Sequence, residues 1–166
     1  MGSTTSVKFK LFSMIRIIAN KGEIESNYRD VSPEFFTHLG RLQNAFAMLA
    51  HHLDSNEPIP VKFTIDKIVN LRDEQNLEGW MYENLNDICN SIGNLVILDL
   101  AKRYNYLQDK YSYYKLSKSK YVRGIITSPI FTFDDWQKRN NHLKQLLADF
   151  FSTPKSYDQT SEIGAF

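Results

Sequence analysis

The chain lacks the features that define several large classes of protein. It has one cysteine, Cys89, in 166 residues, which excludes an internal disulfide and a zinc site built from several cysteines. No apolar run approaches the roughly 20 residues that a membrane-spanning helix needs. Residues 1–10 also lack the apolar core of a signal peptide. We therefore expect a cytoplasmic protein that has no membrane partner.

The chain as a whole also lacks a strong charge of either sign. Its 20 basic residues nearly balance 19 acidic residues, which gives a net charge of +1. Hydrophobic residues make up 42% and charged residues 23%, values typical of a globular domain. The bases are, however, unevenly distributed, because residues 102–123 contain a single acid, Asp109. The seven bases of this segment are Lys102, Arg103, Lys110, Lys115, Lys118, Lys120 and Arg123. Such local charge favours contact with an anionic partner.

Apolar residues at helical spacing predict a long helix in the first half of the chain. Ser32 and Pro33 form a typical helix start, a capping residue followed by proline at the first helical position. The apolar stripe recurs every three or four residues and stops before the prolines of residues 58–60. Its members are Phe35, Leu39, Leu42, Phe46, Leu49 and Leu53. Residues 7–19 fit either a helix or a strand.

Short strands and further helices are expected in the second half. β-Branched and aromatic residues predict strands at 61–65 and 94–98. Apolar spacing predicts helices at 80–92, 99–121 and 132–150, the last opened by a capping box from Thr132 to Asp135. Polar composition predicts loops at 70–79 and beyond Pro154. The sum is an α+β fold, mostly helical, with one small two-stranded element.

The most informative motif runs from Asn90 to Leu98 and reads Asn-Ser-Ile-Gly-Asn-Leu-Val-Ile-Leu. It follows a strand-like run that ends in Asp66, and it precedes the basic segment, which is also rich in tyrosine. In this order the residues resemble the HNH (ββα-metal) nuclease core, in particular the C-terminal domain of GmrSD-type restriction endonucleases. The signature of that family is Asn-x-Ile-Gly-Asn-Leu-x-x-Leu.

Shorter matches extend this resemblance along the chain. They are Leu107 to Lys110, Tyr114 to Ser117, and the spacing of Phe131, Arg139 and Leu143. The resemblance implies a small two-stranded ββα-metal core packed among helices. It divides the chain into a helical region at 1–58, an HNH-like domain at 59–152 and a flexible tail at 153–166. The region before residue 60 would match the helical spacer of a longer protein.

The same resemblance implies a metal-dependent nuclease site whose central residues are altered. Asp66 falls on the acidic ligand for Mg²⁺, a cation that prefers oxygen donors, and Asn94 is the asparagine of the signature. Lys67 stands where the family has its histidine base, and a lysine with a pKa near 10.4 stays protonated. Arg103 stands where the family has a metal-binding asparagine, and a guanidinium offers no lone pair. Asn105 would bind metal only if the loop carried an insertion.

We therefore expect Lys67 and Arg103 to occupy the space of the ion and to pair with Asp66. This arrangement predicts a catalytically inactive or strongly impaired domain that has no cofactor. Only an active domain would bind Mg²⁺, through Asp66 and Asn105. Such a domain would also need a base recruited from elsewhere in the chain.

The basic segment has two open interpretations. Its side chains would contact phosphates and stack on exposed bases, or its tyrosines would pack inward beneath a solvated helix face. The candidate nucleic-acid contacts are Arg103, Lys110, Tyr113, Lys115, Lys118 and Lys120.

Three functions remain open at this point. The first is a degenerate HNH domain of a prokaryotic restriction or anti-phage system, which binds DNA or supports a partner subunit or the remainder of a longer protein. The second is an active metal-dependent DNA endonuclease. The third is a helical protein-interaction domain.

The remaining candidate ligands are four histidines and the cysteine. His51 and His52 are expected at the surface of a helix end, where a cation suits the helix dipole, and a metal role for the pair is the alternative. His38 and His142 are expected to be structural or exposed. Cys89 lies on an apolar helix face and is expected in the core.

Overall fold

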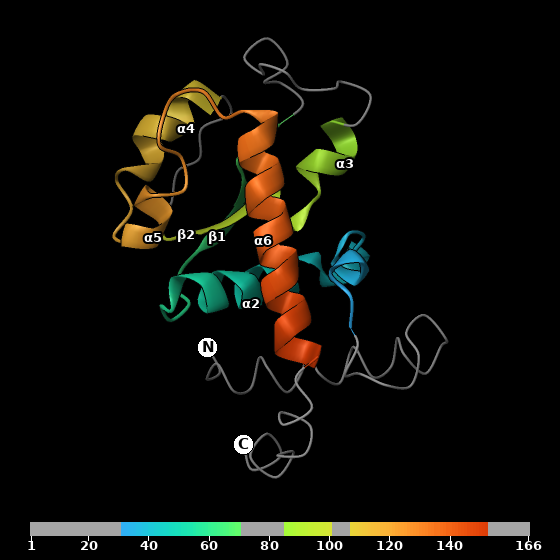
Figure 1. The fold of residues 1–166 in the computed structure, drawn as a ribbon. Helices are drawn as coiled ribbons and strands as arrows, with labels where there is room; N and C mark the ends of the chain where they lie inside the picture. Colours follow the sequence, from blue (N-terminus) through green and yellow to red (C-terminus); the bar gives the residue numbers. More distant parts are fainter. Residues whose placement is uncertain (1–30, 71–84, 101–106, 153–166) are drawn as a thin grey trace.

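The computed structural model describes residues 31–70, 85–100 and 107–152 (Figure 1). Its elements in chain order are η2 (Pro33–Phe36), η3 (Gly40–Leu42), α2 (Gln43–Ser55), β1 (Thr64–Lys67), α3 (Leu85–Cys89), η6 (Ile92–Asn94), β2 (Leu95–Leu98), α4 (Leu107–Tyr114), α5 (Lys120–Arg123) and α6 (Phe133–Ser152). The described part is mostly helical and contains one two-stranded antiparallel sheet, which confirms the expected α+β class. None of its helices is long and apolar enough to cross a bilayer. The expectations for residues 7–19 and for the tail lie outside the described residues.

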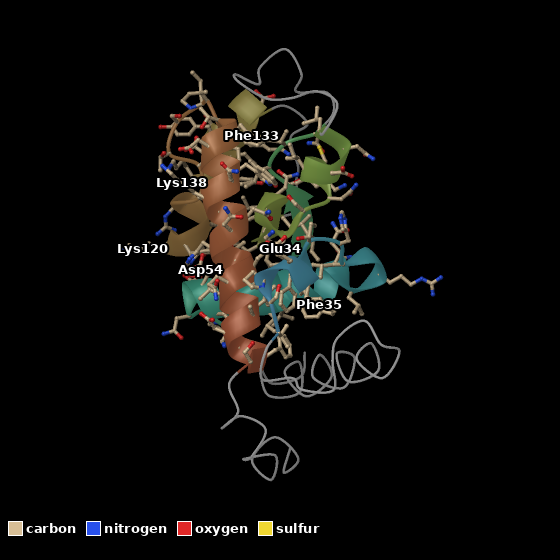
Figure 2. The ribbon with its side chains drawn as sticks, turned by 45° about the vertical axis from the view of Figure 1, so that its right-hand side comes forward. Glu34, Phe35, Asp54, Lys120, Phe133 and Lys138 are labelled. Atoms are coloured by element: carbon tan, nitrogen blue, oxygen red, sulfur yellow. The ribbon has the colours of Figure 1, made fainter. Side chains whose placement is uncertain are left out.

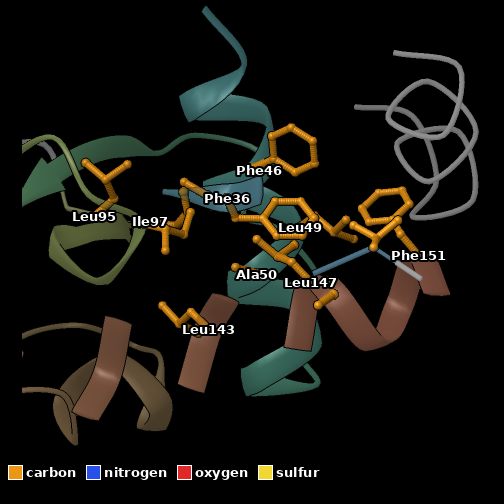
Figure 3. Packing of buried hydrophobic residues seen from close by; sticks show 13 residues of the cluster. Phe36, Phe46, Leu49, Ala50, Leu95, Ile97, Leu143, Leu147 and Phe151 are labelled. Atoms are coloured by element: carbon orange, nitrogen blue, oxygen red, sulfur yellow. The ribbon is translucent and has the colours of Figure 1, made fainter. Parts of the chain in front are cut away.

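Strand β2 lies at the centre of the described part because both of its faces are buried. Leu95 and Ile97 join a cluster with α2 and α6, which is shown from close by in Figure 3. Val96 and Leu98 point the other way and join a second cluster with α3, α4 and α5. Successive side chains of a strand alternate between its faces, so a strand buried on both sides needs an unbroken apolar run. This requirement explains the string Leu-Val-Ile-Leu.

Helix α6 is the longest described element and runs beside the sheet in Figure 1. The predicted capping box is confirmed at its start. The backbone N–H of Asp135 donates to Thr132 Oγ1 at 3.1 Å, and the backbone N–H of Thr132 donates to Asp135 Oδ2 at 2.9 Å. This reciprocal pair satisfies N–H groups that have no partner within the helix. Leu143, Leu147 and Phe151 then face the first cluster.

The long helix predicted from residue 33 onward is wrong in its first part. Ser32 and Pro33 start a helical turn as expected, but only the 3₁₀ turns η2 and η3 precede α2. Gly40 interrupts the helix because its φ is +53°, a left-handed conformation that glycine adopts readily. The predicted end before residues 58–60 is confirmed, since α2 stops at Ser55 and Asn56 follows in the left-handed conformation.

Two other element boundaries also differ from the prediction. The first strand lies at 64–67 instead of 61–65, and Val61 is 87% exposed. The helix predicted at 99–121 is wrong as a single element, because α4 ends at Tyr114 and α5 begins at Lys120. Polar side chains end it: Ser119 Oγ accepts from the backbone N–H of Val122 at 3.1 Å and caps α5. Serine competes with helical hydrogen bonding in this way.

The turn that leads into β2 is held by one face of α6. Trp136 Nε1 donates to Ser91 Oγ at 2.7 Å, and the backbone N–H of Gly93 donates to Asn140 Oδ1 at 2.9 Å. Arg139 Nε and Nη2 donate to the carbonyls of Gly93 and Leu95, each at 3.1 Å. The three α6 side chains stand at relative positions 0, +3 and +4, which share one helix face. They fix the position of β2 and, through it, of β1.

Gly93 makes this docking possible because it has no side chain. A Cβ at this position would lie 2.5 Å from both Cα and Cβ of Asn140 and 2.7 Å from its backbone nitrogen. Backbone atoms in the middle of a helix cannot yield to such a contact. The glycine of the signature motif therefore has a packing role.

We predict that Gly93→Ala lowers the free energy of unfolding by about 2 kcal/mol or more, because the added methyl group separates α6 from the turn. Gly124→Ala is the matched control, since a Cβ there would meet its nearest neighbour, the Tyr121 carbonyl oxygen, at an ordinary 3.5 Å. We expect the control to change stability by less than about 0.5 kcal/mol. Urea unfolding followed by circular dichroism measures both variants. Equal stability of the two would contradict the docking described above.

Candidate functional site

Asp66 lies on β1 and is buried. It sits opposite Val96 of β2, in the register that also pairs Thr64 with Leu98. The hydroxyl of Tyr114 donates to Asp66 Oδ2 at 2.7 Å. The ammonium of Lys110 lies 3.6 Å from the same oxygen. The carboxylate thus has a hydrogen-bond donor and a cation, both from α4.

Lys110 is fully buried, which is rare for a lysine. Besides pairing with Asp66, its ammonium donates to the carbonyl of Lys67 and, at 3.2 Å, to that of Ile68. Burial of a charged group costs several kcal/mol unless other groups compensate for it. Here a carboxylate and two carbonyls surround the ammonium. The pair is therefore a structural ion pair.

Tyr114 completes this arrangement one helical turn after Lys110. Burial, together with the negative charge of Asp66 and the hydrogen bond to it, raises the pKa of Tyr114 well above its usual value. The phenol therefore stays protonated and remains a donor to the carboxylate. We call Asp66, Lys110 and Tyr114 the buried triad.

The cation that pairs with Asp66 is Lys110, and the expectation that Lys67 pairs with it is wrong. Lys67 is the next residue on β1, and adjacent strand side chains point to opposite faces. Its ammonium donates to Asn90 Oδ1 at 2.9 Å. Lys110 takes the place that we had expected Lys67 to fill. Arg103 and Asn105 lie outside the described residues.

Asn94 is fully buried, and all of its described contacts are with the backbone. Its Oδ1 accepts from the backbone N–H of Val69 at 2.8 Å. Its Nδ2 donates to the carbonyls of Val69 and Cys89, each at 2.9 Å. The amide therefore extends the pairing between the two strands past the last residue of β1 and before the first residue of β2, and it ties this turn to α3. These three hydrogen bonds give Asn94 a structural role.

The five candidate nucleic-acid contacts that lie within the described residues fall into two groups. Lys110 and Tyr113 are buried, so the expectation that they face a nucleic acid is wrong in this structure. Inward packing is confirmed for Tyr113 and for its neighbour Tyr114. Lys115, Lys118 and Lys120 are exposed, as contact with phosphates requires.

A second group of polar side chains lines a hollow of about 670 Å³ where α2 ends beside α5 and α6. The Tyr121 hydroxyl donates to Asp54 Oδ2 at 2.6 Å, and it accepts from Arg139 Nη1 at 2.9 Å. His142 Nε2 lies 2.7 Å from Asp54 Oδ1. Lys120 and Lys138 also line this hollow, and Figure 2 shows both on the same side of α6 as Asp54. We call it the α5–α6 hollow.

The hydrogen bonds of the α5–α6 hollow fix the charges of its members. Partial burial opposes ionisation of Asp54, but its bonds to Tyr121 and His142 hold the pKa of this carboxyl below its usual value. Burial raises the pKa of Tyr121 to about 12, against the opposing charge of Arg139. Asp54 is therefore ionised and Tyr121 neutral near neutral pH.

This hollow could not be predicted from the sequence because its residues come from three elements. Asp54 is 67 residues from Tyr121 and 88 from His142, and no local motif joins them. His142 is half-exposed, and Cys89 is buried, as expected for both. His51 is buried against the ring of Tyr121 at 5.1 Å, so its expected surface position is wrong.

Comparisons with known proteins add nothing to this geometry, because no family model, curated protein or solved structure matches the chain. Within the described ranges, no group of three or more His, Cys, Asp and Glu side chains could hold a metal ion. The function must therefore be argued from the buried triad and the exposed lysines.

The buried triad predicts strong coupling between Asp66 and Lys110. Lys110→Met or Asp66→Asn alone leaves one buried charge without its counter-charge, and we expect each to cost about 3 kcal/mol or more of unfolding free energy. The double variant keeps an acceptor for Tyr114 and has no buried charge. We expect it to cost at least about 1 kcal/mol less than the sum of the single variants. Urea unfolding of all four proteins measures this difference, and strictly additive losses would contradict the pairing.

His51 predicts a fall in stability in weak acid. Burial, with help from the charge of Arg139, lowers its pKa to about 4 from an ordinary value of 6.5. Between these two pH values His51 is therefore protonated in the unfolded chain but neutral in the folded chain. The free energy of unfolding falls as the pH drops through this range. We expect the free energy of unfolding to fall by about 2 kcal/mol more in the native protein than in His51→Phe between about pH 7 and about pH 4.5. His38→Phe, at an exposed histidine, is the control. An identical pH dependence of stability in the native protein and in His51→Phe would refute the lowered pKa of His51.

Proposed function

We propose that the chain is a degenerate HNH-like domain of a prokaryotic restriction or anti-phage system. It binds DNA, or supports a partner subunit, and cleaves little or no DNA. The observation that carries this proposal is the buried triad, in which the ammonium of Lys110 stands 3.6 Å from the carboxylate that a nuclease would use for its metal.

The chemistry of Mg²⁺ supports an inactive site. Mg²⁺ needs several oxygen ligands at about 2.1 Å in an octahedron and keeps some of its waters. Asp66 is buried, and one of its oxygens already accepts from Tyr114. A divalent ion at this carboxylate would have to displace Lys110, and the displaced ammonium would lose its counter-charge and two carbonyl acceptors. Lys67 offers no replacement base beside Asp66, because its side-chain nitrogen donates to Asn90 Oδ1 at 2.9 Å.

The exposed lysines support contact with a polyanion. Lys115 and Lys118 lie just after α4, and both side chains reach solvent. Asp99 accepts from Ser117 Oγ at 2.5 Å and from the backbone N–H of Lys118 at 3.0 Å. These bonds hold the pKa of Asp99 below its usual value although partial burial opposes this. Phosphates would therefore meet the lysine ammonium groups while the acid is turned to the protein.

We predict that the purified protein retains closed circular plasmid DNA at low salt and leaves it uncut with Mg²⁺ or Mn²⁺. Lys115→Glu combined with Lys118→Glu should weaken retention by about 10-fold or more at about 0.1 M salt. It should also lower the slope of log K against log salt concentration by the contribution of about two phosphate contacts. Filter binding over a range of NaCl concentrations measures retention, and gel electrophoresis of the same samples detects nicking.

The matched control compares single charge reversals. Arg41→Glu changes the net charge as much as Lys118→Glu does, but Arg41 lies in η3, across α6 from α5 in Figure 1. We expect only Lys118→Glu to weaken retention. Equal retention by the native protein and the double variant would refute the DNA surface. Metal-dependent nicking that disappears in Asp66→Asn would instead establish the active endonuclease.

A further inference from the structure

We propose that the α5–α6 hollow binds a phosphate monoester, either a free nucleotide or the phosphorylated end of a nucleic acid. This site is separate from the buried triad and from Lys115 and Lys118. It is therefore independent of the function proposed above.

Arg139 is the fixed donor of the hollow. A guanidinium has five N–H groups, and three of them donate to the carbonyls of Gly93 and Leu95 and to the Tyr121 hydroxyl. Within the described part of the chain, the other two N–H groups have no partner and can donate to a ligand. Because the other three hold the group in place, little conformational entropy is lost when it binds an oxyanion.

The two acids of the hollow are already engaged. Asp54 meets Tyr121 with one oxygen and His142 with the other. Glu57 Oε2 accepts from Ser119 Oγ at 2.7 Å. These contacts direct the acids toward the protein, so the ammonium and guanidinium groups dominate the interior of the hollow.

His142 is oriented by Asp54 for contact with a phosphate. The carboxylate fixes Nε2 as a donor, so the second ring nitrogen, Nδ1, is left for a ligand. A neutral ring would accept from the P–OH group of a monoester monoanion. A protonated ring would donate to the dianion. The side chain is 55% exposed, so a ligand can reach it.

Two lysines from different elements complete the site. Lys120 belongs to α5, and within the described ranges its ammonium makes no hydrogen bond or ion pair. Lys138 belongs to α6, and its ion pair is with Asp134 one turn earlier, at 2.9 Å. Both partners of this pair are largely exposed, so its contribution is small and Lys138 can turn to a ligand.

These donors favour a monoester over a diester. Lys120, Lys138 and Arg139 carry three fixed positive charges, and His142 adds a fourth donor. A phosphate monoester presents three terminal oxygens and up to two charges, whereas a diester presents two such oxygens and one charge. The hollow, of about 670 Å³, is also large enough for a nucleoside beside the phosphate.

The proposal is tested by NMR titration of the ¹⁵N-labelled protein with inorganic phosphate, thymidine monophosphate, thymidine and dimethyl phosphate. We expect shifts at Gly124 and Ile125, which line the hollow, with phosphate and the monophosphate only. Lys120→Gln and Lys138→Gln should each weaken monophosphate binding by about 10-fold. Lys62→Gln, in a neighbouring hollow of about 570 Å³, should leave it unchanged.

A second arm separates the two sources of the monoester. Oligonucleotides with a 5′-phosphate or a 5′-hydroxyl are compared with the free nucleotide. Preference for the phosphorylated oligonucleotide identifies a nucleic-acid end, and binding of the free nucleotide alone identifies a small-molecule site. Equal binding by dimethyl phosphate, or equal affinity in the Lys120→Gln and Lys62→Gln variants, would overturn the proposal. Plasmid retention through Lys115 and Lys118 does not enter this test, so the two proposals can fail separately.

Discussion

The buried carboxylate of Asp66 imposes the strongest constraint on this structure. An ionised carboxylate inside a protein needs a compensating charge and hydrogen bonds, and α4 supplies both through Lys110 and Tyr114. The helix must therefore lie across β1. The Lys110 ammonium also binds the carbonyls of Lys67 and Ile68, where β1 ends. The space beside the Asp66 carboxylate is thus filled by the chain itself.

The second constraint is the docking of the turn before β2 on α6. Gly93 allows the close approach, and Arg139 and Asn140 bind the turn through its backbone. Backbone recognition of this kind depends on main-chain geometry and on a missing Cβ more than on the identity of neighbouring side chains. It holds the two-stranded sheet between the two apolar clusters.

The elements that could be predicted are those specified by local patterns. The apolar string of residues 95–98 predicts a buried strand, and Thr132 with Asp135 predicts the start of α6. The breaks in the other helices were missed because they depend on single residues. Gly40 adopts a positive φ, and Ser119 caps a new turn, although the apolar spacing continues through both positions.

The site was harder to predict because its contacts are distant in sequence. Asp66 is the one acid of the short strand Thr64–Lys67, but its partner Lys110 lies among six other bases in a segment that resembles a solvated surface. Composition cannot distinguish a buried lysine from exposed ones, since burial is decided by the position of α4 over β1. The same holds for Asp54, Tyr121 and His142. Kinship with HNH nucleases remains a prediction from the motif of residues 90–98.

The central claim is that a lysine ammonium takes the place of a divalent cation at Asp66. Crystals grown or soaked in MnCl₂, with diffraction recorded at the manganese absorption edge, test it most directly. We expect no anomalous peak at the Asp66 carboxylate and continuous density for Lys110 beside it. A manganese ion bound to Asp66, with Lys110 displaced, would contradict the account.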